Sequence, residues 1–330
     1  MSMSNNEKLR GVNLGGWLVL EKWMFPEVFN STDTENEYDL STTEFGQKKI
    51  QLHHKNLIQE EDFRWLHNNR LNAVRIPVGY WIFGDEPPFV GSILHLDRAF
   101  DYAKKYDIKI IICLHGAPGS QNGHQHSGAP EQGSRWFYNR RFQNQTLEIL
   151  SKLVNRYSSH PALWGLELLN EPKPGPLKIL ILRRFYRKAY DLLSDKTRIV
   201  FSDAFLPRIM NGALNASTFI DIHWYHFAFL PERYTPLSLY YRVLKHRTKL
   251  LKRLKSTQPV LIGEWSIVLS TLTLRHYPKD IHEAMMDEHG RHQLVTYEEA
   301  DGWFYWSYKT TGRGTWNFRS LVEDGRLILS

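Results

Sequence analysis

Cysteine is almost absent from this 330-residue chain, in which Cys113 stands alone. A single cysteine excludes an intrachain disulfide and a zinc site built from several cysteines. The chain also lacks an uninterrupted run of about 18 apolar residues, so the sequence predicts no membrane span. Residues Met1–Arg10 are polar and contain no apolar signal core. We therefore expect a cytoplasmic protein, secreted only if a leader has already been removed.

Repeats, low-complexity tracts and linkers are missing as well. We therefore expect one domain over residues 1–330, with residues 1–8 as an N-terminal tail. The 42 Lys and Arg against 35 Asp and Glu give a net charge of +7. These cations are spread along the chain, and their densest run, Lys245–Lys255, has the pattern of a solvated helix face, so we expect no nucleic-acid partner. The sequence predicts nothing about the oligomeric state.

Short apolar runs alternate with amphipathic stretches along the chain. The apolar runs are rich in β-branched and aromatic residues on both faces, which is typical of buried parallel strands. We expect strands at Arg10–Leu18, Asn72–Val78, Lys109–His115, Leu163–Asn170, Arg198–Asp203, Phe219–Tyr225, Val260–Trp265 and Trp303–Tyr308. We expect helices at Glu60–Asn69, Asp97–Tyr106, Phe142–Arg156, Ile179–Leu193, Leu237–Leu254 and His282–Glu299.

Eight strands with intervening helices predict an α/β fold, namely a (β/α)₈ barrel of the TIM type. A doubly wound open sheet is the alternative. That fold usually carries a Gly-rich phosphate loop after its first strand. Here residues Gly11–Gly16 read GVNLGG and lack the G-x-G-x-x-G spacing. We expect no cofactor.

Polar or aromatic residues close most of the predicted strands, which is where barrel enzymes carry their chemistry. A charge buried at such a place is unfavourable unless it is paired or used. Two carboxylates stand out, because Glu171 and Glu264 follow strands four and seven, whose ends face each other across a barrel mouth. The complete set is Arg75, His115, Asn170, Glu171, Asp203, His223, Tyr225, Glu264 and Trp306.

Two such carboxylates can cleave a glycosidic bond. One donates a proton to the leaving oxygen and the other attacks the anomeric carbon. A separation of about 5–5.5 Å means retention through a covalent intermediate, whereas about 6.5–9.5 Å means inversion. Arg75 beside Glu264 would keep that carboxylate ionised. The alternative is that both carboxylates only cap loops.

Seven segments resemble glycoside hydrolase family 5, and most of all its branch of exo-β-1,3-glucanases and β-glucosidases. They span nearly the whole chain in family order: RGVNLGGWLVLE at 10–21, VRIPV at 74–78, HGAPGSQNG at 115–123, LLNEP at 168–172, DIHWY at 221–225, IGEWS at 262–266 and GWFYWSYK at 302–309. The resemblance implies a cofactor-free retaining β-glucosidase that acts on a carbohydrate by double displacement.

The resemblance also implies a role for each matched residue. Glu171 would be the acid/base and Glu264 the nucleophile. Asn170 would bind the 2-hydroxyl of the first sugar, and Trp306 would be the floor on which that sugar stacks. The remaining matched residues would contact this sugar or hold Glu264, with Glu131 in a looser alignment: Glu21, Arg75, His115, Glu131, His223 and Tyr225.

The segment after Gly123 departs from the family pattern on the leaving-group side. The fungal glucanases usually carry an aromatic residue followed by Asp-Asn-Ser-Gly, whereas this chain has His124 and His126 in HQHSG. Position 228 is Ala where those enzymes usually have Phe. We expect both histidines to border the sugar site. The sequence leaves the aglycone open between a β-glucan oligosaccharide and a glycolipid, with a transglycosylase or a non-catalytic carbohydrate-binding barrel as alternatives.

Three further features have competing interpretations. His115, His124 and His126 suit zinc, but no carboxylate or fourth ligand accompanies them, and we predict no metal site. Trp136 lies in a predicted mouth loop, where we expect a sugar platform. The basic, amphipathic segment Lys178–Arg187 is expected to be an outer barrel helix without stable membrane insertion, and a helix lying on a membrane surface is the alternative.

Overall fold

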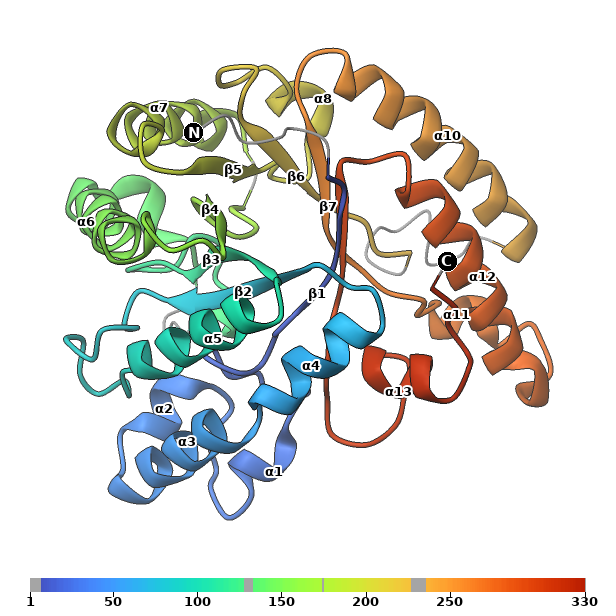
Figure 1. Ribbon diagram of the computed structural model, residues 1–330, viewed down its shortest axis with the longest axis horizontal. Helices are drawn as coiled ribbons and strands as arrows, with labels where there is room; N and C mark the ends of the chain where they lie inside the picture. The colour runs from blue at the N-terminus through green and yellow to red at the C-terminus, as the bar shows by residue number, and fades with distance from the viewer. Residues whose placement is uncertain (1–6, 128–132, 174, 227–235, 330) are drawn as a thin grey trace.

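The computed structural model describes residues 7–127, 133–173, 175–226 and 236–329. Its eight strands are all parallel and close into a barrel, since β8 pairs with β1. The closed barrel confirms the predicted fold class and excludes the doubly wound open sheet (Figure 1). The strands are β1 (Leu9–Asn13), β2 (Ala73–Gly79), β3 (Lys109–Gly116), β4 (Leu163–Glu167), β5 (Arg198–Ser202), β6 (Phe219–His223), β7 (Val260–Trp265) and β8 (Gly302–Tyr305).

Helices surround this barrel as an outer ring (Figure 1). Short 3₁₀ segments accompany them at Gln125–Ser127, Arg135–Tyr138 and Lys279–Ile281. The helices are α1 (Pro26–Phe29), α2 (Glu37–Ser41), α3 (Glu44–Asn56), α4 (Glu60–Asn68), α5 (Ile93–Lys105), α6 (Arg140–Tyr157), α7 (Pro176–Leu193), α8 (Pro207–Met210), α10 (Leu237–Lys255), α11 (Thr271–Leu274), α12 (His282–Tyr297) and α13 (Phe318–Glu323).

The barrel interior changes from apolar to polar toward the carboxyl ends of the strands. A small apolar cluster fills the first inner layer, with Ala73 and Ile111 among its members. Side chains two residues further along a strand point to the same face. The next inner layer therefore holds Arg75 on β2 and Cys113 on β3, both buried. This alternation places charged groups directly beneath the mouth of the barrel.

Helices α1 to α3 form an insertion between β1 and β2 that the sequence analysis does not predict. Helix α3 begins at a cap in which the Thr43 side chain accepts a hydrogen bond from the Gly46 backbone N–H. Its inner face buries Ile50, which packs with Phe25 and Trp306 in a second apolar cluster. The insertion thus supports the residue that follows β8.

The predicted first strand, Arg10–Leu18, is longer than the observed one. Strand β1 ends at Asn13, and Gly16 then adopts a positive φ of 68°. A side chain at Gly16 would meet the Phe25 ring at 2.6 Å, so the turn requires glycine. Of the expected tail at residues 1–8, residues 1–6 lie outside the described part of the chain, and Lys8 forms an ion pair with Glu298 at 3.2 Å.

Candidate functional site

Arg75 is the hub of the polar layer beneath the barrel mouth. Its guanidinium is 1% exposed, and all five of its N–H groups donate hydrogen bonds. The accepting oxygens belong to Glu167 (2.7 and 3.2 Å), Asn13 (2.8 Å), Glu264 (2.9 Å) and Asn170 (2.8 Å). Although burial disfavours the cation, the acidic groups around it hold the pKa of Arg75 well above its ordinary value.

Glu264 receives two donors at the end of β7. Its Oε1 accepts from Arg75, and its Oε2 accepts from the Tyr225 hydroxyl at 2.7 Å. The residue before it must be glycine, because a Cβ on Gly263 would lie 2.0 Å from an Asp221 carboxylate oxygen. Burial raises the pKa of Glu264 to about 7, while the charges of His223 and Arg75 oppose that rise.

Glu171 lies four residues beyond β4, in a left-handed backbone conformation with φ of 41°. Its Oε1 faces His223 Nδ1 at 2.7 Å. Burial disfavours the Glu171 carboxylate, but the hydrogen bond and charge of His223 outweigh this effect and lower the pKa of Glu171 to about 2. The positive-φ turn and this hydrogen bond together fix the direction in which the carboxyl group points.

His223 lies among three carboxylates at the end of β6. Its Nδ1 is 2.7 Å from Glu171 and 3.5 Å from Glu264, and its Nε2 is 3.3 Å from Asp221. Burial lowers the pKa of His223, but these carboxylates raise it well above the ordinary value overall. The raised pKa of His223 and the lowered pKa of Glu171 both favour an ion pair between a protonated His223 and an ionised Glu171.

The two predicted catalytic carboxylates are close together. One oxygen of Glu171, one oxygen of Glu264 and a ring nitrogen of His223 all lie within 4.8 Å of one another. Glu167, Asp221 and His223 form a second group of this kind among the described residues. In that group Arg75 Nε lies 2.7 Å from Glu167 and 3.7 Å from Asp221, so the guanidinium already supplies a cation.

A chain of polar contacts joins two neutral histidines beside Glu171 to Arg75 through Asn170. Because the Asn170 carbonyl oxygen accepts from Arg75, its amide N–H₂ faces His115 Nε2, at 3.5 Å. His126 Nδ1 lies 3.3 Å from the same nitrogen of His115. Burial lowers the pKa of His126 to about 4 and that of His115 well below its ordinary value.

His126 Nε2 has two polar neighbours. The Asn122 amide lies 3.4 Å from it, and Glu171 Oε2 lies 3.8 Å from it. The His124 ring stacks on His126 with a centroid distance of 5.4 Å. Among the described residues, His115, His124 and His126 do not form a group of three ligating atoms close enough for a metal ion.

An aromatic wall lies beside this polar centre. The Trp306 ring stacks parallel to His115, with centroids 5.5 Å apart. Trp23 is 43% exposed and donates from Nε1 to Glu21 Oε2 at 2.8 Å. The Trp23 ring meets Trp316 edge to face at 5.1 Å. Burial raises the pKa of Glu21 to about 8.

One predicted site residue lies elsewhere, and another is not described by the structure. Trp136 is wrong as a sugar platform, because it is fully buried, packs against Phe185 and donates from Nε1 to Thr146 at 2.9 Å. Glu131 lies outside the described residues, as does position 228. The structure brings together the other predicted residues: Glu21, Arg75, His115, His124, His126, Asn170, Glu171, His223, Tyr225, Glu264 and Trp306.

Sequence reasoning misses Asn13, Glu167 and Asp221. Each is buried and lies within a predicted strand rather than at its end. For Glu167 and Asp221 the available signal was a charge inside an otherwise apolar strand, which requires a buried partner. Arg75 is that partner for Glu167 and, through a longer contact, for Asp221. Trp23 is missed as well, although it lies only two residues after Glu21.

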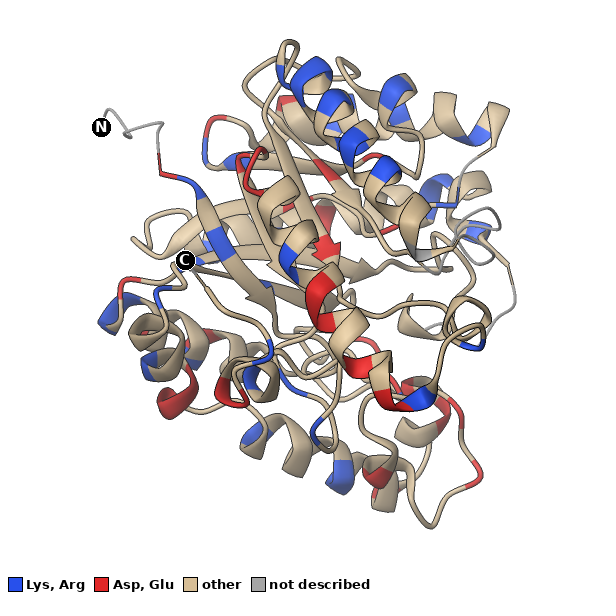
Figure 2. Ribbon diagram, turned by 90° about the vertical axis from the view of Figure 1, so that its right-hand side faces the viewer, with Lys and Arg blue, Asp and Glu red and all other residues tan. Residues whose placement is uncertain are grey.

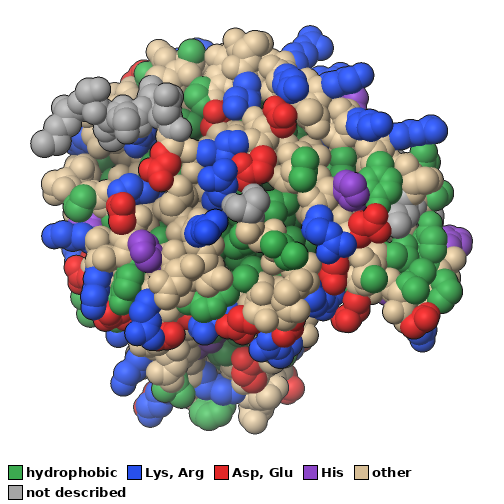
Figure 3. Space-filling view, turned by 45° about the vertical axis from the view of Figure 1, so that its right-hand side comes forward, with side chains coloured by type: hydrophobic (Ala, Val, Ile, Leu, Met, Phe, Trp, Pro, Cys, Tyr) green, Lys and Arg blue, Asp and Glu red, His purple; other side chains and the backbone are tan. Residues whose placement is uncertain are grey.

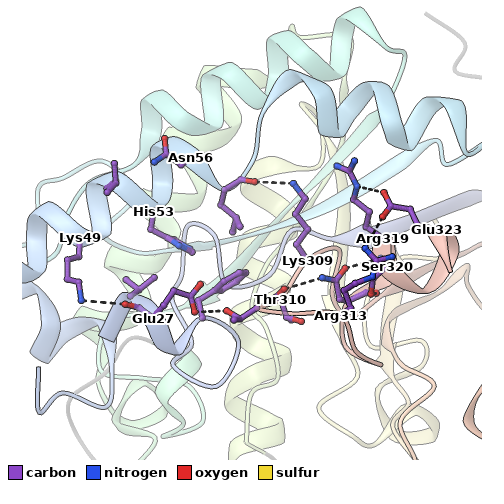
Figure 4. A pocket seen from close by; sticks show the side chains of 16 residues that line it. Glu27, Lys49, His53, Asn56, Lys309, Thr310, Arg313, Arg319, Ser320 and Glu323 are labelled. Carbon is purple, nitrogen blue, oxygen red and sulfur yellow. Dashed lines mark hydrogen bonds and ion pairs between the residues drawn. The ribbon is translucent and has the colours of Figure 1, made fainter. Parts of the chain in front are cut away.

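A cavity of about 630 Å³ lies between α3 and the segment from Lys309 to α13 (Figure 4). Its charged lining residues are paired with their neighbours. Arg319 donates to Glu323 at 2.8 Å, and Lys309 donates to the Leu57 carbonyl at 3.4 Å. None of the residues lining it closes a strand, so the candidate active site is the carboxylate pair and not this cavity.

Comparison with known proteins gives a consistent result. A family profile described as Cellulase (glycosyl hydrolase family 5) matches residues 38–189. Probable glucan 1,3-beta-glucosidase A of Aspergillus niger is 30% identical over 364 residues, covering 96% of this chain and 86% of the relative. The glucan 1,3-beta-glucosidase of Schwanniomyces occidentalis is 29% identical, covering 97% of this chain and 87% of the relative.

Solved structures share the fold. Rutinosidase from Aspergillus niger superposes with a TM-score of 0.83 at 20% identity, covering 98% of both chains. Endoglucanase Cel5A from Thermotoga maritima superposes with a TM-score of 0.59 at 16% identity, covering 97% of this chain and 96% of the endoglucanase.

The relatives correct the expected location. The prediction of a cytoplasmic protein is wrong, because the relatives are fungal glucan 1,3-beta-glucosidases, which are typically secreted or cell-wall enzymes. None of the helices in the described part of the chain is long and apolar enough to cross a membrane.

Proposed function

The chain belongs to glycosyl hydrolase family 5, and from this premise we propose that it is a retaining β-glycosidase that hydrolyses β-glucosidic bonds. We assign the role of nucleophile to Glu264 and that of acid/base to Glu171. The whole chain, residues 1–330, would be one catalytic domain. Its substrate is a carbohydrate, as for the glucan 1,3-beta-glucosidases it is similar to.

The observation that carries this proposal is the distance between the two carboxyl groups. An oxygen of Glu171 and an oxygen of Glu264 lie within 4.8 Å of each other. Retaining enzymes hold their carboxyl groups about 5–5.5 Å apart, whereas inverting enzymes leave room for a water at about 6.5–9.5 Å. The short separation supports direct attack by one carboxylate on the anomeric carbon.

The hydrogen bonds to Glu264 support its role as nucleophile in the first step, because they oppose the burial that raises its pKa to about 7. Arg75 and Tyr225 both donate to Glu264, so they stabilise the carboxylate that attacks the anomeric carbon. A protonated His223 lies 2.7 Å from Glu171 Oε1, so His223 can supply the proton that Glu171 passes to the leaving oxygen. The glycosidic C–O bond breaks, Glu264 forms the glycosyl ester, and the leaving alcohol takes up the proton through Glu171.

The second step reverses these roles. A water molecule gives its proton to Glu171 and attacks the anomeric carbon. The bond to Glu264 breaks, and its carboxylate returns to the hydrogen bonds of Arg75 and Tyr225. Two inversions at one carbon yield the β-sugar.

The first sugar would bind between the aromatic wall and the polar hub. Trp306 offers a flat face, held parallel to the His115 ring. Asn170 is oriented by Arg75, and its amide would meet the 2-hydroxyl. Glu21, held by the indole N–H of Trp23, would accept sugar hydroxyls. We retain Glu131 as a candidate contact to the same sugar.

The leaving group would meet His124 and His126. His126 Nε2, 3.8 Å from Glu171 Oε2, would form a hydrogen bond with a hydroxyl of the group attached to the glycosidic oxygen. Imidazole rings in place of the usual aromatic clamp favour a polar leaving side. We therefore propose short β-glucan oligosaccharides and other β-glucosides, including glycolipids, as the substrate class.

The test is hydrolysis of p-nitrophenyl β-glucoside, mannoside, galactoside, xyloside and cellobioside, with the product anomer followed by proton NMR. We expect release from the glucoside and β-glucose as the first product. α-Glucose as the first product would refute the retaining mechanism. If the glucosyl group is transferred to an added sugar at high concentration rather than to water, the same site would belong to a transglycosylase. Binding of these glycosides without any release would assign the protein to the carbohydrate-binding barrels.

A further inference from the structure

Positive charge is concentrated on three neighbouring helices. Helices α7, α8 and α10, which we call the basic arc, contain thirteen Lys and Arg and a single acid, Asp191. The whole chain carries a net charge of only +7, so the remainder of the molecule is net acidic. The three helices follow one another along the top of the barrel in Figure 1, and blue segments mark α10 along its length in Figure 2.

Side-chain contacts join the three helices into one surface. Arg183 on α7 donates to the Ile209 carbonyl oxygen on α8. Arg208 on α8 lies 3.3 Å from His246 on α10. A groove of about 470 Å³ on α7 is lined by Leu180, Arg183, Arg184, Arg187, Lys188 and Asp191.

Most cations of the basic arc have no acidic partner. In the part of the chain that the structure describes, Lys252 and Lys255 reach Glu299 and Asp301, at 4.0 and 3.0 Å. The other exposed cations form no ion pair with any described residue: Arg184, Arg187, Lys188, Arg208, Arg242, Lys245, Lys249 and Arg253. Figure 3 shows basic side chains gathered at the upper right, over α10.

Exposed aliphatic side chains accompany these cations. Leu177 and Leu180 on α7 are 59% and 64% exposed, Ile209 on α8 is 51% exposed, and Leu239 on α10 is 37% exposed. In a (β/α)₈ barrel each helix starts at the face where the preceding strand ends. Leu177, Leu180 and Leu239 are therefore at the helix ends nearest the mouth.

We propose that the basic arc docks this enzyme on a membrane surface that carries acidic phospholipid headgroups. Each exposed Lys or Arg near such a surface contributes attraction, and aliphatic side chains enter the headgroup boundary. A nucleic acid or an anionic polysaccharide would use the cations but leave the leucines in water. Docking by the mouth-side ends of α7 and α10 would turn the active site toward glucosides held in the membrane. This orientation matters only for the proposed function, on which this part of the inference rests.

The experiment is sedimentation with sucrose-loaded vesicles of phosphatidylcholine, either pure or with roughly 30% phosphatidylserine, at about 0.1 M salt. Full-length protein is compared with Lys245→Glu/Lys249→Glu on α10. The matched control is Lys55→Glu/Lys104→Glu, which changes the net charge equally on α3 and α5. Leu177→Ser/Leu180→Ser tests the aliphatic contribution at constant charge.

We expect wild type and control to bind the acidic vesicles at least about tenfold more tightly than the neutral ones, and the α10 variant to lose about tenfold or more. The leucine variant should lose several-fold. Equal loss in the control would overturn the proposal, because net charge alone would explain binding. Two results together would overturn the proposal in favour of a soluble polyanion: the leucine variant binds vesicles as tightly as wild type, and wild type binds dextran sulfate as tightly as acidic vesicles. Hydrolysis of p-nitrophenyl β-glucoside is assayed separately, so a failed proposed function is distinguished from failed docking.

Discussion

The buried charges around Arg75 and the exposed charges of the basic arc are used in opposite ways. Around Arg75 every N–H donor has an acceptor within 3.2 Å. On α10, Arg242, Lys245, Lys249 and Arg253 have no acidic partner among the described residues. Burial forces charges to pair, and pairing shifts their pKa values enough for chemistry. Solvent tolerates unpaired charges, whose attraction then adds up over a surface and weakens with salt.

The largest effect is expected when the buried nucleophile is removed. Glu264→Ala should lower kcat by about 10⁴-fold or more, because no other described group can reach the anomeric carbon from that side. Release of p-nitrophenol measures this loss, and circular dichroism checks that the variant is folded. Full activity in the folded variant would refute the assignment.

Azide distinguishes the two carboxylates. In Glu264→Ala, azide should restore turnover and give the α-glucosyl azide, because it attacks the substrate directly. In Glu171→Ala, azide should attack the glycosyl-enzyme and give the β-glucosyl azide. The opposite pair of products would mean that the two roles are exchanged.

Removal of the buried cation Arg75 should have the next largest effect, and this effect is on the stability of the fold rather than on turnover. Arg75→Ala leaves Glu167 as a buried carboxylate without its cation, and it removes one cationic partner from Glu264 and from Asp221. We expect the free energy of unfolding to fall by about 3–5 kcal/mol, measured by urea denaturation at pH 7. Lys245→Ala on the basic arc is the matched control, and we expect it to change by less than about 0.5 kcal/mol. Similar losses in both variants would abolish the distinction between the two regions.

Glu37 gives a third case beside the paired charges around Arg75 and the exposed charges of the basic arc, because it is a buried carboxyl group without a cationic partner among the described residues. It accepts hydrogen bonds from the Leu20 backbone N–H and from Trp81 Nε1, at 2.7 and 3.0 Å. Burial raises its pKa to about 8. Between the ordinary pKa of about 4.5 and that value, the folded state binds a proton that the unfolded state has released. The contribution of Glu37 to stability is therefore lost as the pH rises through this window.

The matching variant is Glu37→Gln, which cannot titrate. The stability of wild type relative to this variant should fall by up to about 1.4 kcal/mol per pH unit between pH 5 and about 8. Urea denaturation of both proteins at each pH gives this difference directly, apart from a constant offset for the altered hydrogen bonds. Parallel stability profiles would show that Glu37 is already ionised at pH 5.

The same contrast explains what the sequence could predict. Residues at strand ends could be found, because their position in a barrel already implies a shared mouth. Glu167 and Asp221 could not, since their role depends on which side chain crosses the barrel to meet them. The prediction that Trp136 is a sugar platform is wrong, because the sequence around this residue does not show that its ring packs on Phe185. Helix α3 was missed because its hydrophobic pattern is weak, with Ile50 as its main apolar anchor.

The smallest effect is expected on the basic arc, and its sign is the informative part. Lys249 lies one helical turn from Lys245 and from Arg253, and each such like-charge pair destabilises a helix by about 0.2–0.5 kcal/mol. Lys249→Glu replaces two repulsions by two attractions and should raise the free energy of unfolding by about 0.8–2 kcal/mol at low salt, with the gain fading at high salt. The same variant should bind acidic vesicles more weakly. A protein that becomes more stable while losing vesicle binding would show that the charge is retained for the surface and not for the fold, whereas a loss of stability would mean that Lys249 has a structural partner after all.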